Sequence, residues 1–112
     1  MIAEKAEEAI EKAVAYELQN IVKKYGAVYA SNHEAYAVLL EEVEEAKEEY
    51  KCMKIWLKAA WRNVKDNQDL EIIVKKIKEH AIELIKESVQ CAAVCERFIE
   101  TLEREEKHEK LD

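Results

Sequence analysis

Proline is absent from this chain of 112 residues, and glycine occurs only once. These two residues interrupt helices and populate tight turns, so their scarcity argues against a turn-rich β-sheet protein. Aromatic residues make up 7% of the chain, and no uninterrupted apolar run approaches the length of a bilayer span. The sequence therefore predicts an all-α fold that does not cross a membrane.

Cysteine is also scarce, and the three cysteines do not follow a metal-binding spacing. Cys91 and Cys95 lie one helical turn apart in an apolar stripe, which is typical of buried, reduced thiols. Such cysteine usage indicates a reducing compartment, so we expect a cytoplasmic protein. The net charge of −7 disfavours binding to a nucleic-acid polymer or to anionic lipid. A phosphorylated small molecule remains a suitable ligand where a cation mediates the contact.

Apolar residues recur at helical spacing over most of the chain. They make up 49% of the residues, enough for a core despite a charged fraction of 38%. The periodicity predicts helices over residues 3–24 and 32–64, and a third that begins near Leu70.

Residues typical of helix ends separate these segments. Gly26 follows the first segment, where a left-handed C-cap belongs. Ser31 and Glu34 form the capping-box pattern at the start of the second segment. Polar residues 66–69 interrupt the apolar pattern and supply N-cap candidates for the third.

We expect one domain over residues 1–102 and a charged tail over residues 103–112 that loses the apolar stripe and frays. A helix over 32–64 would be about 50 Å long, whereas a compact monomer of this size is about 35 Å across. Either this helix kinks near residues 51–53, or it overhangs and pairs with another subunit. Three helices also leave a four-helix bundle incomplete. We therefore expect a homodimer or tetramer that completes a four-helix-bundle-like core.

Two polar clusters lie beside the apolar stripes of different helices: residues 41–45, with sequence Glu-Glu-Val-Glu-Glu, and residues 87–90, with sequence Glu-Ser-Val-Gln. At 100° per residue, Glu42 and Glu45 fall about 60° and about 120° from the stripe, on the same side. Glu87 and Gln90 fall at the corresponding angles on the third helix. Glu42, Glu45 and Glu49 thus form an acidic row beside the core. Two such faces brought together would suit a hard divalent cation.

The spacing alone favours a plainer interpretation. The pattern Glu-Glu-x-x-Glu occurs four times in a chain with 25 acidic residues, and most charge runs are solvated helix flanks. A non-catalytic helical interaction module, whose acidic face binds a basic partner, therefore remains an alternative. A ferritin-like di-iron bundle needs Glu-x-x-His pairs on core faces, and the only such spacing runs from Glu105 to His108 in the tail.

Short sequence blocks favour the metal site. Residues 33–45 resemble the first metal-binding helix of the MazG-like, all-α nucleoside triphosphate pyrophosphohydrolases, and are most similar to the small phage-type members. Lys24-Tyr25-Gly26 is similar to the Lys-aromatic-Gly that closes the preceding helix in that family. Residues 86–93, followed by Arg97-Phe98-Ile99, resemble its second motif. The family's Glu-x-x-Glu falls on Glu42 and Glu45, and its Glu-x-x-Asp falls on Glu87 and Gln90.

This resemblance implies hydrolysis of a nucleoside or deoxynucleoside triphosphate to the monophosphate and pyrophosphate, with Mg²⁺ or, in its place, Mn²⁺. It implies that Glu42, Glu45, Glu87 and Gln90 bind the metal and that Glu41 and Glu42 take part in catalysis. The chain departs from the family pattern in two ways. Gln90 replaces the usual Asp, so Glu83 or Glu49 would have to supply the missing carboxylate. The segment between the two motifs, with Trp56 and Trp61, is also long.

Three further residues are weaker candidates for substrate binding. Lys24 could contact phosphate, although a lysine near a helix C-terminus also complements the helix dipole. Trp56 could stack on a base, although a subunit interface explains it as well. Glu83 lies on the same side of its helix as Glu87. His80, one turn before Glu83, fits a hydrogen-bonded structural role.

Overall fold

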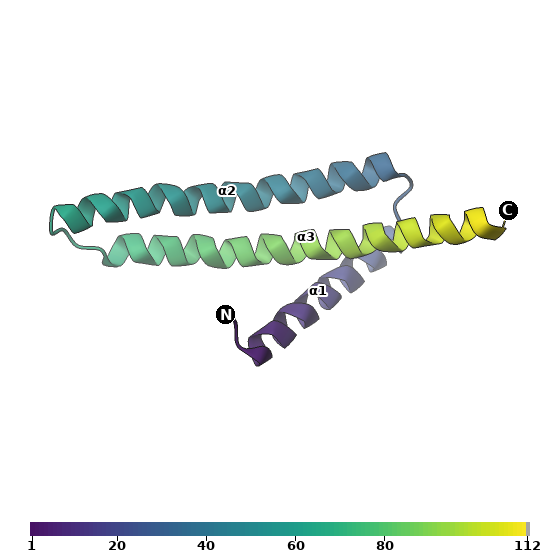
Figure 1. The fold of residues 1–112 in the computed structure, drawn as a ribbon, viewed down its shortest axis with the longest axis horizontal. Helices are drawn as coiled ribbons and strands as arrows, with labels where there is room; N and C mark the ends of the chain where they lie inside the picture. The colour runs from purple at the N-terminus through teal and green to yellow at the C-terminus, as the bar shows by residue number, and fades with distance from the viewer. Residues whose placement is uncertain (112) are drawn as a thin grey trace. The chain divides into compact units, whose positions relative to one another are not determined.

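The computed structural model describes residues 1–111, and the side chains of residues 1–108. These residues form three helices, α1 (Glu4–Tyr25), α2 (Asn32–Lys65) and α3 (Glu71–Leu111) (Figure 1). The all-α prediction is confirmed, and the expected bounds of α1 and α2 agree with the observed ones to within one residue. Among the described residues, none of the helices has an apolar stretch long enough to span a membrane.

Local side-chain chemistry ends α1 and begins α2. The N–H of Gly26 donates to the carbonyl of Val22 at 2.8 Å, and Gly26 has φ +91° and ψ 173°. Its positive φ favours glycine, but its ψ lies outside the left-handed helical region that we expected for this cap. The hydroxyl of Ser31 accepts a hydrogen bond from the N–H of Glu34 at 3.1 Å, as the capping pattern predicts.

The turn between α2 and α3 is fixed by its polar residues. Asn67 adopts φ +53°, and the next N–H, of Gln68, donates to the carbonyl of Asn63 at 2.8 Å. This left-handed residue with a six-to-one hydrogen bond is a Schellman motif, which closes the end of a helix. The carboxylate of Asp69 then accepts the N–H of Glu71 at 3.0 Å and caps α3. The predicted polar interruption thus ends one helix and starts the next.

Two compact units share the long helices. Unit 1 contains residues 1–42 together with the described residues from Val89 onward, and unit 2 contains Val43–Ser88. Helix α2 is unbroken over its 34 residues, about 51 Å, with no interruption at residues 51–53. Helix α3 continues through residues 103–111, where the apolar stripe is lost. Its side chains over 103–108 are exposed, as the loss of the stripe predicts.

Unit 1 has a small core where the 26–31 connection packs on the helices. Tyr29, Ala35 and Val94 are buried there, surrounded by partly buried Ile21, Val38, Leu39 and Phe98. The ring of Tyr29 meets the edge of Phe98 with centroids 6.3 Å apart. The core therefore joins the connection to both α2 and α3.

Arg97 is the charged residue of this core and is only 5% exposed. Its guanidinium donates to the carbonyls of Gly26, Tyr25 and Val28 at 3.0, 2.9 and 3.0 Å and lies 3.9 Å from the ring centre of Tyr29. One turn later on α3, Thr101 accepts the N–H of Tyr29 at 2.9 Å. Helix α3 thus fixes the path of the chain between α1 and α2.

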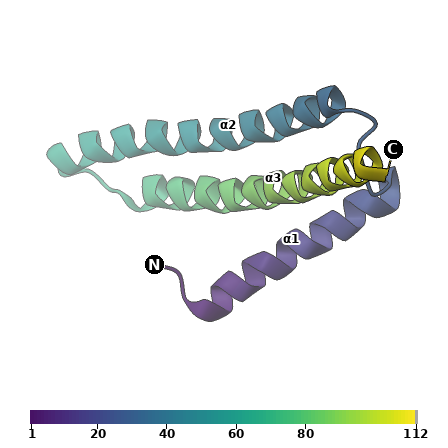
Figure 2. The ribbon, with the colours of Figure 1, turned by 45° about the vertical axis from the view of Figure 1, so that its right-hand side comes forward.

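Unit 2 is a helical hairpin with very little of its surface buried. Within it, the second part of α2 and the first part of α3 lie side by side and run in opposite directions (Figures 1 and 2). Among its described residues, only Ile73 is a buried hydrophobic residue. Val43, Tyr50, Leu57 and Val64 follow α2 at intervals of seven residues and are 47%, 53%, 61% and 47% exposed. An apolar line with this period is typical of a helix that packs against another helix.

Candidate metal centre

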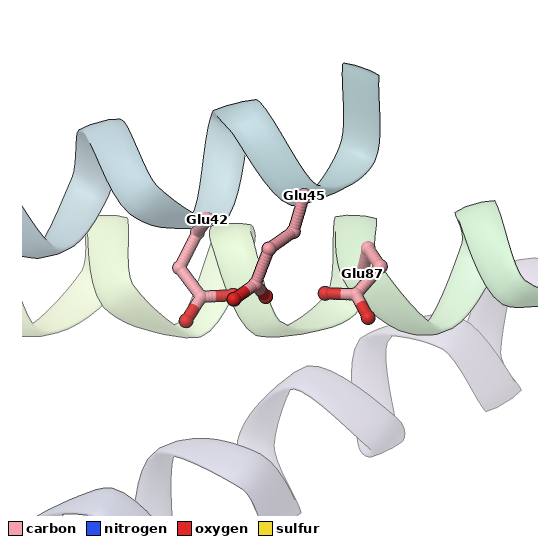
Figure 3. Close-up of side chains that lie close together, drawn as sticks. All are labelled: Glu42, Glu45 and Glu87. Carbon is pink, nitrogen blue, oxygen red and sulfur yellow. The ribbon is translucent and has the colours of Figure 1, made fainter. Parts of the chain in front are cut away.

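Three of the predicted carboxylates come together where α2 and α3 lie side by side. One carboxylate oxygen of each of Glu42, Glu45 and Glu87 lies within 4.8 Å of the other two. Glu45 and Glu87 belong to unit 2, and Glu42 lies one turn before Glu45 on the continuous helix α2. Figure 3 shows the carboxylates of Glu42 and Glu45 from α2 and that of Glu87 from α3 directed to one region. The structure brings together these three of the four residues predicted to bind the metal.

The spacing and burial of these oxygens suit a small, hard cation. Mg²⁺ binds oxygen at about 2.0–2.1 Å, so opposite ligands of one ion are about 4.2 Å apart. The three oxygens lie within 4.8 Å of one another, and at most two of three ligands can be opposite, so the carboxylates would have to move closer together to share one ion. Glu45 is exposed and can rotate, whereas Glu42 and Glu87 are half-buried. An all-carboxylate donor set favours Mg²⁺ or Mn²⁺ over softer metals.

The other acidic candidates near this cluster have partners of their own. The carboxylate of Glu49 is 2.7 Å from Nδ1 of His80, and both side chains are 26% exposed. The carboxylate of Glu83 accepts a hydrogen bond from Nζ of Lys86 at 2.9 Å and raises the pKa of that lysine. Neither Glu49 nor Glu83 belongs to the three-carboxylate group found among the described residues. The hydrogen-bonded role expected for His80 is observed.

Gln90 and Glu41 occupy different positions from the three clustered carboxylates. Gln90 is exposed on α3 and lines a cavity of unit 1 together with Glu42. Its amide oxygen can supply a neutral ligand or hold a water molecule. Glu41 is exposed on α2 and lies outside the three-carboxylate group.

The weaker substrate-binding candidates are distributed over the two units. Lys24 is exposed in the last turn of α1, where its charge complements the helix dipole. Trp56 is half-buried on α2 within unit 2. Neither position identifies a substrate contact.

A cavity of about 480 Å³ lies within unit 1. Its wall is formed by residues of α1, of the connection to α2, and of α2 and α3: Glu17, Ile21, Tyr25, Tyr29, Glu34, Val38, Glu42, Gln90, Val94 and Arg97. This volume is within the range of small-molecule sites, and the mixture of apolar and polar groups is typical of them. Glu42 belongs to both the cavity wall and the carboxylate cluster.

Sequence reasoning did not identify two residues of this cavity. Tyr29 is 4% exposed, and its buried hydroxyl has no hydrogen-bond partner in the described structure. Arg97 occurs in the second block of the family resemblance, but its contacts are with residues about 70 positions earlier in the chain. One indication in the sequence was available: Arg97 lies four residues from Ala93 and from Thr101, so it shares a helix face with two small residues. All three residues are buried.

Two cysteines lie on the part of α3 that belongs to unit 1. Cys91 lies beside Cys95, and the structure contains free thiols at both positions. Burial raises the pKa of the Cys91 thiol above its ordinary value, with further contributions from Cys95 and Glu42. The raised pKa keeps the Cys91 thiol protonated and poorly nucleophilic at neutral pH, in agreement with the expected structural role.

Comparison of the chain with protein-family models, with curated proteins and with solved structures finds no match in any of the three.

Proposed function

We propose that this chain is a divalent-metal-dependent hydrolase that converts a nucleoside or deoxynucleoside triphosphate to the monophosphate and pyrophosphate. The observation that carries this proposal is the group of Glu42, Glu45 and Glu87, contributed by two helices. The sequence blocks that resemble the MazG-like pyrophosphohydrolases support the choice of reaction. Glu42 and Glu87 are half-buried, whereas the acidic residues of two other runs are exposed: Glu7, Glu8, Glu105 and Glu106.

The cluster has the groups that this reaction needs. A bound Mg²⁺ supplies charge neutralisation and polarisation of the phosphate oxygens. Glu45 and Glu87 would hold the ion, and the half-buried Glu42 would orient the attacking water and accept its proton. The oxygen of that water forms a bond to the α-phosphorus while the bond from this phosphorus to the oxygen of the leaving pyrophosphate breaks. Glu41, which is exposed, would act only through its effect on Glu42.

We also propose that the chain works as a homo-oligomer in which unit 2 pairs with unit 2 of a second copy. Ten large apolar side chains of this hairpin are between 44% and 68% exposed. With about 150–200 Å² for each large side chain, they sum to roughly 1,000 Å² per copy. This area is similar to one side of a standard protein–protein interface, about 800 Å². Pairing of two hairpins would complete a four-helix bundle.

Pyrophosphate release from a panel of nucleoside and deoxynucleoside triphosphates, with Mg²⁺, with Mn²⁺ and with a chelator, tests the activity. We expect release only with metal, and its loss in Glu42→Gln and in Glu87→Gln without unfolding. Glu79→Gln is the matched control, because Glu79 is an exposed residue of α3 that pairs with Lys76. Wild-type turnover in both cluster variants would show that the site is wrongly assigned. Absence of turnover, together with no effect of Mg²⁺ on the melting temperature, would favour the interaction module.

A further inference from the structure

Carboxylates are the charged hydrogen-bond acceptors in the wall of the unit 1 cavity. The carboxylates of Glu17 and Glu34 line it, and Glu17 is half-buried. Three donors of Arg97, which also lines it, are already occupied by backbone carbonyls. The other N–H groups of Arg97, the amide of Gln90 and the tyrosine hydroxyls remain as donors in the wall. The carboxylates are therefore the groups that favour a ligand with N–H donors.

A buried hydroxyl gives a second, independent indication of a ligand. Tyr29 lines the cavity, and its hydroxyl is enclosed without a hydrogen-bond partner in the described structure. Buried polar groups are nearly always hydrogen-bonded, because an unsatisfied one loses its interaction with water and gains nothing in return. A ligand that offers a polar atom to this hydroxyl would remove that cost. The hydroxyl can either donate or accept.

The apolar part of the wall suits a flat ring. Ile21, Val38 and Val94 supply aliphatic surface, and the ring of Tyr25 is 72% exposed and available for stacking. A nucleobase has an apolar face and a polar edge, so it would meet both kinds of group. Glu42 belongs both to the cavity wall and to the carboxylate cluster, so a ligand of the cavity contacts a residue of the proposed reaction site.

We infer that this cavity binds the base of the substrate nucleotide and selects bases that carry an exocyclic amino group, namely guanine, adenine and cytosine. This inference rests on the proposed function and specifies its substrate class. An amino group donates to a carboxylate of Glu17 or Glu34. Uracil and thymine instead present one N–H between two carbonyl oxygens, and those oxygens would be repelled by the carboxylates.

Calorimetric titration with the four free ribonucleosides, in the presence of a chelator, tests the base site without the metal or the triphosphate. We expect guanosine, adenosine and cytidine to bind at least tenfold more tightly than uridine. In the double variant Glu17→Gln/Glu34→Gln this preference should fall below threefold, because an amide both donates and accepts. Glu8→Gln, on an exposed residue of α1, is the control and should keep the preference.

Tyr29→Phe gives a separate readout. It should weaken guanosine binding severalfold while it raises the melting temperature of the ligand-free protein, since it removes an unsatisfied hydroxyl. Equal binding of all four nucleosides, or binding of none, would overturn the base-site inference even where metal-dependent hydrolysis is intact. Selective nucleoside binding by a protein that lacks hydrolysis would instead support the cavity and count against the proposed reaction.

Discussion

Arg97 is expected to stabilise unit 1 more than any other single charged side chain of the described structure, and Arg97→Met tests this. The substitution keeps an apolar stem of similar length but removes the guanidinium. Three hydrogen bonds, to the carbonyls of Tyr25, Gly26 and Val28, would be lost, together with the contact to the ring of Tyr29. These are the contacts that connect α3 to the chain between α1 and α2.

The magnitude follows from the number of bonds and from the exposure of their acceptors. A hydrogen bond from a charged donor contributes about 1.5–3 kcal/mol, so three would give roughly 5–9 kcal/mol if none were replaced. Tyr25 and Gly26 are exposed, and water can satisfy their carbonyls in the variant. The apolar Met side chain also avoids the cost of burying a charge. We therefore expect a net loss of about 3 kcal/mol in the free energy of unfolding.

Arg97→Lys should cost about 2 kcal/mol, because a lysine keeps the charge but cannot reach three carbonyls with a planar group. Arg104→Met is the matched control. Arg104 lies two turns further along α3, where it forms an exposed ion pair with Glu100, and its loss should cost less than about 0.5 kcal/mol. Urea unfolding followed by circular dichroism, at one fixed protomer concentration, measures all three variants. A loss below about 1 kcal/mol for Arg97→Met would refute this account of the core.

Three other predictions concern the metal ligands, the thiols and the assembly. Gln90→Asp adds a carboxylate to the cavity wall that Glu42 also lines. If this position binds the metal, the variant should need less Mg²⁺ for half-maximal activity and show a larger rise in melting temperature with Mg²⁺. Equal titrations of both proteins would exclude a metal role for this position. Because the folded state raises the pKa of Cys91, the unfolded state releases its thiol proton first, and stability should fall as pH rises above the ordinary value of 9.0. Cys91→Ala should reduce this fall in the free energy of unfolding at alkaline pH, as measured by urea unfolding at several pH values. The same pH dependence in the variant and the wild type would contradict the prediction. Leu57→Asp should convert the proposed oligomer to monomer in sedimentation velocity, whereas Lys58→Asp, on an exposed neighbour, should not. A stable wild-type monomer at micromolar concentration would contradict the proposed assembly.

Helix ends could be predicted because their chemistry is local. Ser31 caps a helix through an N–H three residues away, and Asp69 does so through one two residues away. The polar segment 66–69 similarly contains both the end of one helix and the start of the next. Gly26 was correctly predicted as a C-cap, but its ψ angle was not correctly predicted. This angle depends on how the following residues pack into the core.

The carboxylate cluster could be predicted in part because a helix fixes the direction of its side chains. The angles of Glu42 and Glu45 from the apolar stripe follow from 100° per residue alone. Glu87 approaches them only where the apolar stripes of α2 and α3 face each other, as the stripes of amphipathic helices in one core do. The partner of Glu49 could not be found in this way, because His80 approaches it only once the two helices have a register. Lys86 follows Glu83 by three residues on the same helix, so that pair was open to prediction from spacing alone.

The cavity could not be predicted from the sequence, for a related reason. Its wall combines α1, the 26–31 connection, α2 and α3, and Arg97 contacts carbonyls about 70 residues away along the chain. Backbone carbonyls have no sequence signature, so an arginine that binds them leaves no partner residue to recognise. Among the described residues, Arg97 has no ion pair with a carboxylate and is held by three backbone carbonyls and the ring of Tyr29. A carboxylate partner would have competed with the three carbonyls, and the connection would then have lost the contacts that place Tyr29 beside the cavity.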